Sequence, residues 1–147
     1  ILWMTGSKVL EVKSYGNKLC TNNSLFKYND FTVSLLKFAN GMVAKISSNF
    51  GCVYPHFHKL TIHGTKKTFE NDIENIRIFN SRDKKNFKKT KNNYKNYYKG
   101  NAIKFFLNSL GKKSLRKKLI DRVINSIKVC FAIERSIKIN TTVKIKY

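Results

Sequence analysis

The sequence is short of paired cysteines and of long apolar runs, and each shortage excludes a class of protein. The 147 residues include three widely spaced cysteines, Cys20, Cys52 and Cys130, with no Cys-x-x-Cys pair. Such a set supports neither a disulfide framework nor a zinc site, so we expect reduced thiols in the core. No apolar run approaches the roughly 20 residues of a membrane-spanning helix, and no basic segment followed by an apolar one opens the chain. We therefore expect a cytoplasmic protein with no membrane partner.

Acidic residues are scarce as well. Only 8 Asp and Glu residues stand against 30 Lys and Arg, which gives a formal net charge of +22. The excess is local, because twenty of the basic residues follow residue 80. Residues 81–100 are rich in Lys and Asn, with aromatic residues interleaved at Phe87, Tyr94, Tyr97 and Tyr98.

Basic residues among aromatic ones can bind nucleic acid through phosphate neutralisation and base stacking. A contact with an anionic substrate or with a neighbouring subunit is a second interpretation, and a solvated loop is a third. Asn, Lys, Ile, Phe and Tyr are frequent along the whole chain, so this composition is not special to residues 81–100. We therefore expect a basic loop over 81–100 and no nucleic-acid partner.

Alternating apolar and polar residues predict paired strands in the first half of the chain. Asn40-Gly41 is typical of a tight hairpin turn between residues 31–38 and 42–50. In the second strand Ala44 and Ile46 share one face while Val43 and Lys45 share the other, and we expect this strand to be central in its sheet. Further strands are predicted over residues 8–15, 59–63, 68–70, 76–79 and 143–145.

Apolar residues at helical spacing predict two helices in the second half. Residues 101–110 form the first, which Gly111 ends. Ser114 is a candidate N-cap for a longer second helix, whose apolar stripe we expect to face the core. The stripe consists of Ile120, Val123, Ile124, Ile127, Cys130, Phe131 and Ile137. Strands followed by helices predict an α+β fold, an open, mainly antiparallel sheet with helices packed on one face. The length suits a single domain over residues 1–147.

Tyr54, His56 and His58 are the clearest candidates for binding chemistry. In extended backbone, residues two apart lie on the same face, so the phenol and both imidazoles would be presented together and could hydrogen-bond sugar hydroxyls. A pair of structural histidines beside a turn at Pro55 is an alternative, and the start of a metal site is another. No third ligand has convincing spacing, although His63 is present, so we expect no metal.

Several segments occur in an order that matches a known family. They are residues 30–33 with 37–41, residues 60–69, and residues 132–136 before a last strand. Together they resemble the carboxy-terminal domain of the Gfo/Idh/MocA oxidoreductases, the glucose-fructose oxidoreductase and inositol dehydrogenase family. Residues 1–6 resemble the end of the family's helix that carries its catalytic histidine. On this resemblance we expect the chain to be truncated before that histidine.

The resemblance implies the C-terminal domain of an NAD(P)-dependent oxidoreductase acting on a sugar, nucleotide sugar or cyclitol. No strand followed by G-x-G-x-x-G occurs, so NAD or NADP is expected to bind chiefly to an absent N-terminal domain, and the fragment alone is expected to be inactive. No catalytic, cofactor-binding or metal residue is expected in this chain.

The resemblance also implies a substrate-binding and oligomerisation domain, with Tyr54, His56 and His58 contacting a sugar-type substrate. A homo-oligomer is expected to form through the open sheet face, at Lys45, Ser47, Asn49, Thr61 or their opposite-face neighbours. The alternative is a non-catalytic basic binding module for nucleic acid or a protein partner.

Overall fold

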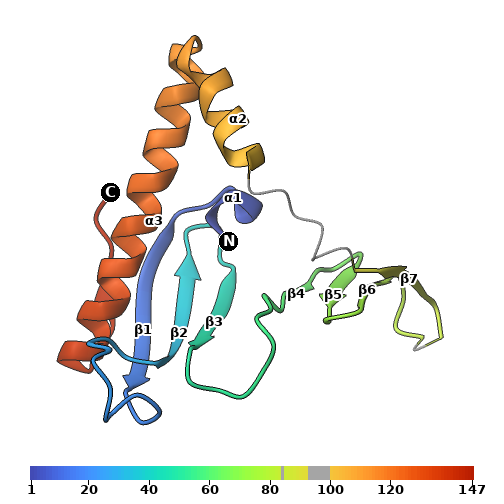
Figure 1. The fold of residues 1–147 in the computed structure, drawn as a ribbon. Helices are drawn as coiled ribbons and strands as arrows, with labels where there is room; N and C mark the ends of the chain where they lie inside the picture. Colours follow the sequence, from blue (N-terminus) through green and yellow to red (C-terminus); the bar gives the residue numbers. More distant parts are fainter. Residues whose placement is uncertain (84, 93–99) are drawn as a thin grey trace. The chain divides into compact units, whose positions relative to one another are not determined.

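The computed structural model describes residues 1–83, 85–92 and 100–147. Two compact units are present (Figure 1). Unit 1 consists of Ile1–Val53 and Asn108–Tyr147, and unit 2 consists of Tyr54–Leu107. Each unit contains its own four-stranded sheet.

Unit 1 contains a sheet with the strand order β3-β2-β1-β8, in which all pairings are antiparallel. The strands are β1 (Val9–Asn17), β2 (Phe31–Phe38), β3 (Val43–Asn49) and β8 (Val143–Lys144), preceded by the short helix α1 (Leu2–Thr5). The predicted turn joins β2 to β3, and Gly41 takes a φ of +84°, a backbone conformation that side chains other than hydrogen disfavour. The expectation that this second strand is central is wrong, because β3 is at an edge of its sheet.

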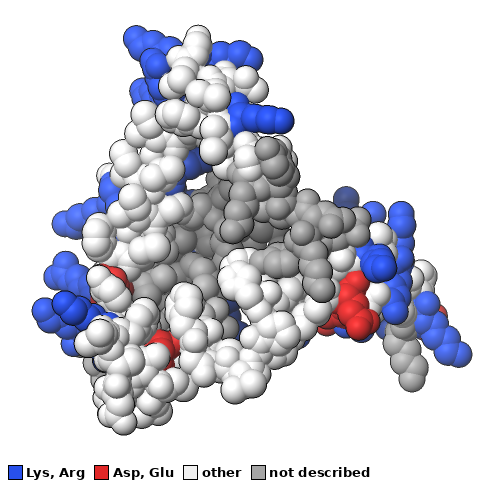
Figure 2. Space-filling view, in the orientation of Figure 1, with Lys and Arg blue, Asp and Glu red and all other residues white. Residues whose placement is uncertain are grey.

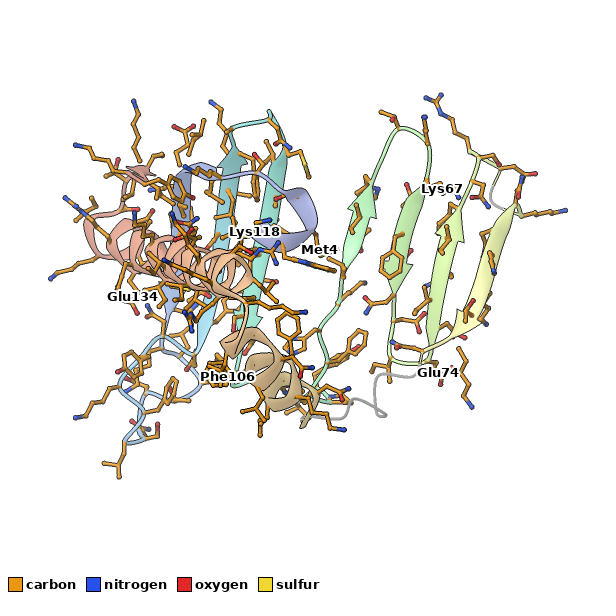
Figure 3. All side chains as sticks on the ribbon, turned by 90° about the horizontal axis from the view of Figure 1, so that it is seen from above. Met4, Lys67, Glu74, Phe106, Lys118 and Glu134 are labelled. Atoms are coloured by element: carbon orange, nitrogen blue, oxygen red, sulfur yellow. The ribbon has the colours of Figure 1, made fainter. Side chains whose placement is uncertain are left out.

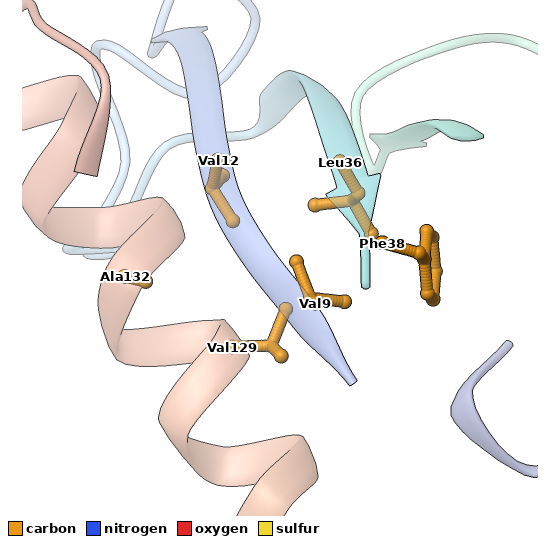
Figure 4. Close-up of a cluster of buried hydrophobic side chains, with 6 residues drawn as sticks. All are labelled: Val9, Val12, Leu36, Phe38, Val129 and Ala132. Atoms are coloured by element: carbon orange, nitrogen blue, oxygen red, sulfur yellow. The ribbon is translucent and has the colours of Figure 1, made fainter. Parts of the chain in front are cut away.

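One face of this sheet is covered by the long helix α3 (Lys113–Ile139). Val129 and Ala132 of α3 are buried together with Val9 and Val12 of β1 and two residues of β2, Leu36 and Phe38 (Figure 4). Strict alternation along a strand would place Val9 and Val12 on opposite faces. A register shift between Val9 and Glu11 brings both side chains into the core, as a β-bulge adds one residue to a strand.

The prediction for the apolar stripe of the long helix is wrong for six of its seven residues, and only Ile137 is half-buried. Ile120, Val123, Ile124, Ile127 and Phe131 are all exposed, Ile127 by 46% and Phe131 by 65%. The face that meets the sheet instead contains Val129, Ala132 and Ser136. Ser114 is not the N-cap either, because the helix begins at Lys113 with Lys112 as its N-cap.

Buried serine hydroxyls join α3 to the sheet. The Ser14 backbone N–H donates to Ser136 Oγ over 2.9 Å, and the Ser136 hydroxyl donates to the Thr141 carbonyl over 2.7 Å. The Ser14 hydroxyl bonds Ser34 Oγ on the neighbouring strand over 2.8 Å. Since buried polar groups are costly without partners, these three serines fix the position of the helix on the sheet.

Unit 2 contains the antiparallel sheet β4-β5-β6-β7, made of β4 (Thr61–His63), β5 (Thr68–Asn71), β6 (Asn75–Phe79) and β7 (Phe87–Lys91) (Figure 3). The basic loop predicted over residues 81–100 is therefore partly wrong, because β7 lies inside it. Residues 84 and 93–99 of that stretch, with Tyr94, Tyr97 and Tyr98, lie outside the described residues.

The helix α2 (Gly100–Leu110) confirms the predicted first helix. The fold class is confirmed as well, since antiparallel open sheets combine with helices and α3 covers one face of the first sheet. Within the described residues, no helix combines the length and the apolar character that crossing a membrane requires.

The prediction that the three cysteines lie in the core is wrong. Cys20, Cys52 and Cys130 are all exposed, and all three are free thiols. Cys20 lies in the connection between β1 and β2, Cys52 follows β3, and Cys130 lies on the outer side of α3.

Candidate substrate-binding site

Tyr54, His56 and His58 lie in an irregular segment at the start of unit 2, between β3 and β4. All three side chains are exposed. The imidazole rings of His56 and His58 have centroids 5.1 Å apart and planes at 82°, an edge-to-face arrangement. The two histidines are therefore brought together as the i, i+2 spacing predicted, although the segment is not part of a strand.

Asn71 at the end of β5 anchors this segment to the sheet. Its side-chain amide donates to the His58 carbonyl over 3.1 Å, and its Oδ1 accepts the backbone N–H of Leu60 over 2.5 Å. The Asn71 backbone N–H also donates to the Leu60 carbonyl. A histidine whose backbone is fixed in this way presents its ring at a defined place, which suits a binding residue.

A metal site is not supported by the arrangement of the described residues. Among them, no group of three or more His, Cys, Asp and Glu side chains is close enough to hold a metal ion. His63 ends β4, where it pairs with Thr68 of β5. A neutral imidazole can both donate and accept a hydrogen bond, so His56 and His58 are suited to binding polar groups.

Strand register brings together a charged row that the sequence alone does not predict. Thr61, Glu70, Arg77 and Lys89 are direct cross-strand partners from β4 to β7. Directly opposed residues point to the same face of a sheet, so one face of unit 2 carries an alcohol, a carboxylate, a guanidinium and an ammonium in line. The Arg77 Nη2 atom lies 3.3 Å from Glu70 Oε1. Each strand alone shows only one member of the row.

Asp72 completes this polar network at the turn from β5 to β6. Its Oδ1 accepts the backbone N–H groups of Asn75 over 2.6 Å and Glu74 over 2.9 Å, and its Oδ2 lies 3.1 Å from Arg77 Nη2. The Asn75 N–H is the largest influence on the carboxyl, and partial desolvation opposes it. The Glu74 N–H and the Arg77 guanidinium add to the stabilisation of the ionised form, and the pKa of Asp72 is lowered.

Positive charge is prominent on the face of the molecule drawn in Figure 2. Figure 2 shows Lys and Arg side chains over the end where α2 meets α3 and over the strands of unit 2. The exposed lysines of unit 2 include Lys88, Lys89 and Lys91, all on β7. A basic surface of this kind raises the local concentration of anionic ligands.

Solved structures of oxidoreductases share this fold. An oxidoreductase domain protein from Kribbella flavida has a TM-score of 0.69 at 12% identity, over 99% of this chain and 47% of that one. Aldose-aldose oxidoreductase from Caulobacter crescentus, complexed with glycerol, has a TM-score of 0.64 at 16% identity, over 98% and 43%. Myo-inositol 2-dehydrogenase from Lactobacillus plantarum has a TM-score of 0.60 at 14% identity, over 99% and 44%. The chain therefore shares the fold of part of each of these structures, and it spans less than half of their length.

The family assignment comes from the sequence. Residues 1–70 match the family model described as the GFO/IDH/MocA C-terminal domain. This match confirms the predicted resemblance, and it covers the first 70 of the 147 residues. No curated protein matches the chain.

The described residues do not fit a dinucleotide. A dinucleotide fold places the pyrophosphate at the start of a helix that connects two parallel strands, whereas every strand pairing described here is antiparallel. The printed sequence also lacks the G-x-G-x-x-G turn. No catalytic step is therefore assigned to a nicotinamide within this chain.

Proposed function

We propose that this chain is the substrate-binding and oligomerisation domain of an NAD(P)-dependent oxidoreductase. The family match over residues 1–70 carries this proposal. The structural neighbours add support, since they include a levoglucosan dehydrogenase in complex with NADH and levoglucosan and a myo-inositol 2-dehydrogenase. A sugar, nucleotide sugar or cyclitol is the proposed substrate class.

The proposed substrate contacts are Tyr54, His56 and His58. A sugar offers several hydroxyl groups, each of which can donate and accept a hydrogen bond, and the phenol and two imidazoles are matching partners. All three residues are exposed at the surface, where a ligand can reach them. The basic surface of unit 2 favours an anionic substrate such as a nucleotide sugar, because it would attract the diphosphate.

The cofactor is proposed to bind chiefly to a separate N-terminal domain, and the present chain alone is proposed to be inactive. NAD or NADP would supply the hydride chemistry, and this chain would supply placement of the substrate. The antiparallel pairing of every described strand supports this division. Calorimetry with NADH on the 147-residue chain is expected to show no micromolar binding.

The sheet face opposite α3 is the proposed contact between subunits. Leu35 of β2 and Val43 of β3 both lie on this face, and they are 50% and 70% exposed. Lys45, Ser47 and Asn49 of β3 lie on the same face and are exposed. Thr61, proposed with them from the sequence, belongs to the other sheet. Sedimentation of the complete enzyme, with Leu35→Lys as the variant, tests whether this face joins subunits.

The decisive experiment uses a chain that carries both domains. His56→Ala and His58→Ala are each expected to lower kcat/KM for the sugar by roughly fivefold to tenfold, since a hydrogen bond contributes about 1 kcal/mol. The dissociation constant for NADH should stay within twofold of its original value, because the histidines are proposed to touch only the sugar.

His63→Ala is the matched control. His63 is exposed and lies five positions further along the chain, at the end of β4, so its loss should leave kcat/KM unchanged. If His56→Ala and His58→Ala keep the original kcat/KM and lose only thermal stability, the two histidines are structural. The substrate must then be bound by other residues.

A further inference from the structure

Two cysteine-bearing segments of unit 1 are held together by one buried residue. Asp30 is 0% exposed, and its Oδ2 accepts the Thr21 backbone N–H over 2.6 Å and the Thr21 hydroxyl over 3.0 Å. Its backbone carbonyl accepts the N–H of Phe50 over 2.8 Å. Thr21 follows Cys20, and Phe50 is two residues before Cys52. Asp30 therefore connects the two segments, through its side chain to the one and through its backbone carbonyl to the other.

Cys20 and Gly51 are in direct contact. A β-carbon placed on Gly51 would lie 2.8 Å from the Cys20 Sγ and 3.7 Å from the Cys20 Cα. Any larger residue at position 51 would displace the Cys20 side chain. The Cys20 side chain thus packs against the backbone of Gly51, the residue before Cys52.

We propose that Cys20 and Cys52 form a disulfide when the protein meets a peroxide. The Cα of Gly51 is about 1.5 Å from the position of its missing β-carbon, so the Cα atoms of residues 20 and 51 are at most about 5.2 Å apart. The Cα of Cys52 follows about 3.8 Å along the chain, so the Cα atoms of residues 20 and 52 are at most about 9.0 Å apart. Disulfides join Cα atoms about 4.4–6.8 Å apart, a range that lies within this limit. Both thiols are exposed and lie outside regular strands. The Cys52 Sγ lies 3.8 Å from the Asn49 carbonyl oxygen, so the proposal requires the Cys52 side chain to turn toward Cys20.

The oxidation proceeds in two steps with hydrogen peroxide as the oxidant. One thiol is oxidised by the peroxide to a sulfenic acid, the O–O bond breaks, and one water leaves. The second thiol then attacks that sulfur, an S–S bond forms, and a second water leaves. Two thiols and one peroxide therefore give one disulfide and two waters. A dithiol reductant reverses the change.

The disulfide would fasten the connection between β1 and β2 to the end of unit 1. The first segment of unit 1 ends at Val53, directly after Cys52, and unit 2 begins at Tyr54. The bond would close a loop of residues 20–52 and restrict the chain that leads to the proposed substrate residues. It is independent of the proposed function, because it requires only the contacts within unit 1.

The test is to count and map thiols in the native 147-residue chain before and after peroxide treatment. Three reactive thiols are expected before treatment and one after it. A non-reduced digest analysed by mass spectrometry should contain one cross-linked peptide pair, joining the peptides of Cys20 and Cys52. Circular dichroism confirms that each sample is folded.

Equilibration with reduced and oxidised glutathione measures how well the pair is pre-positioned. The effective concentration of Cys20 toward Cys52 is expected to exceed the millimolar value that a flexible linkage gives. Cys130→Ser is the matched control and should form the same disulfide, whereas Cys20→Ser and Cys52→Ser should form no intramolecular one. Over-oxidised cysteines without a cross-link, equal cross-linking to Cys130, or an effective concentration at or below millimolar would overturn the proposal.

Discussion

Val129→Asp and Ile127→Asp on the same helix distinguish the buried face of α3 from its exposed face. Val129 is 7% exposed and packs in the core, whereas Ile127 is 46% exposed. Removing a buried valine from the core costs about 2 kcal/mol, and burying a carboxyl in its place adds about 1–3 kcal/mol. The expected loss for Val129→Asp is therefore about 3–5 kcal/mol, a large part of the 5–15 kcal/mol that stabilises a typical domain.

Ile127→Asp should be much less costly. Its side chain is already half in water, so about half of a full isoleucine burial, about 1 kcal/mol, is lost. The introduced carboxylate stays solvated, and Lys128 and Arg122 are nearby in sequence on a strongly basic chain. The difference between the two variants is therefore expected to exceed about 2 kcal/mol.

Urea unfolding followed by far-ultraviolet circular dichroism measures both losses. With a slope of about 2 kcal/mol per M urea, the midpoint should fall by about 2 M for Val129→Asp and by about half a molar for Ile127→Asp. Equal midpoint shifts, or a larger one for Ile127→Asp, would refute the placement of α3 on the sheet. A larger shift for Ile127→Asp would indicate that the stripe at Ile120, Ile124, Ile127 and Phe131 is the buried one.

Two further substitutions test local structure. Gly41 has a φ of +84°, so Gly41→Ala should destabilise the β2–β3 hairpin by about 1 kcal/mol; an unchanged urea midpoint would contradict the turn geometry. The pKa of Asp72 is lowered mainly by the N–H of Asn75, so its contribution to stability is present above its unfolded pKa and is lost as the pH falls through its lower folded pKa. Asp72→Asn should remove this part of the acid dependence, and a carboxyl titration by NMR that gives Asp72 an ordinary pKa would contradict the hydrogen bonding at the turn.

Local sequence patterns were sufficient to predict those elements that pack against residues close to them in the sequence. Asn40-Gly41 predicts the β2–β3 hairpin because only a few residue types adopt its backbone. The alternation from Val43 to Asn49 predicts which side chains of β3 share a face, and one of the two faces is exposed in the structure. Position within the sheet is not local. Whether β3 is central or at an edge depends on pairing with segments far along the chain, and β8 closes the opposite edge from position 143.

Strand β7 shows why composition misled the prediction for residues 81–100. Phe87–Lys91 contains three lysines, which favour a solvated loop when the sequence is considered alone. β7 is the edge strand of its sheet, and lysine on an edge strand hinders pairing with other chains. The lysines are therefore compatible with a strand, and only its pairing with Asn75–Phe79 of β6 reveals it.

The candidate site also has one feature that local spacing predicts and one that depends on pairing between strands. The proximity of His56 and His58 follows from their i, i+2 spacing and is present in the structure. The row of Thr61, Glu70, Arg77 and Lys89 depends on the register of four strands. A shift of one residue in any pairing would move a member of the row to the other face, so no pattern within one strand could predict it.

Helix α3 has two apolar faces, and hydrophobicity selects the wrong one. The larger side chains, Ile120, Ile124, Ile127 and Phe131, are exposed, while the face on the sheet has Val129, Ala132 and Ser136. Small residues allow a helix backbone to approach β1 closely, and the Ser136 hydroxyl then bonds both Ser14 and Thr141. The apolar spacing predicted that a helix forms, whereas the size of the side chains and their hydrogen bonds decide which face it buries.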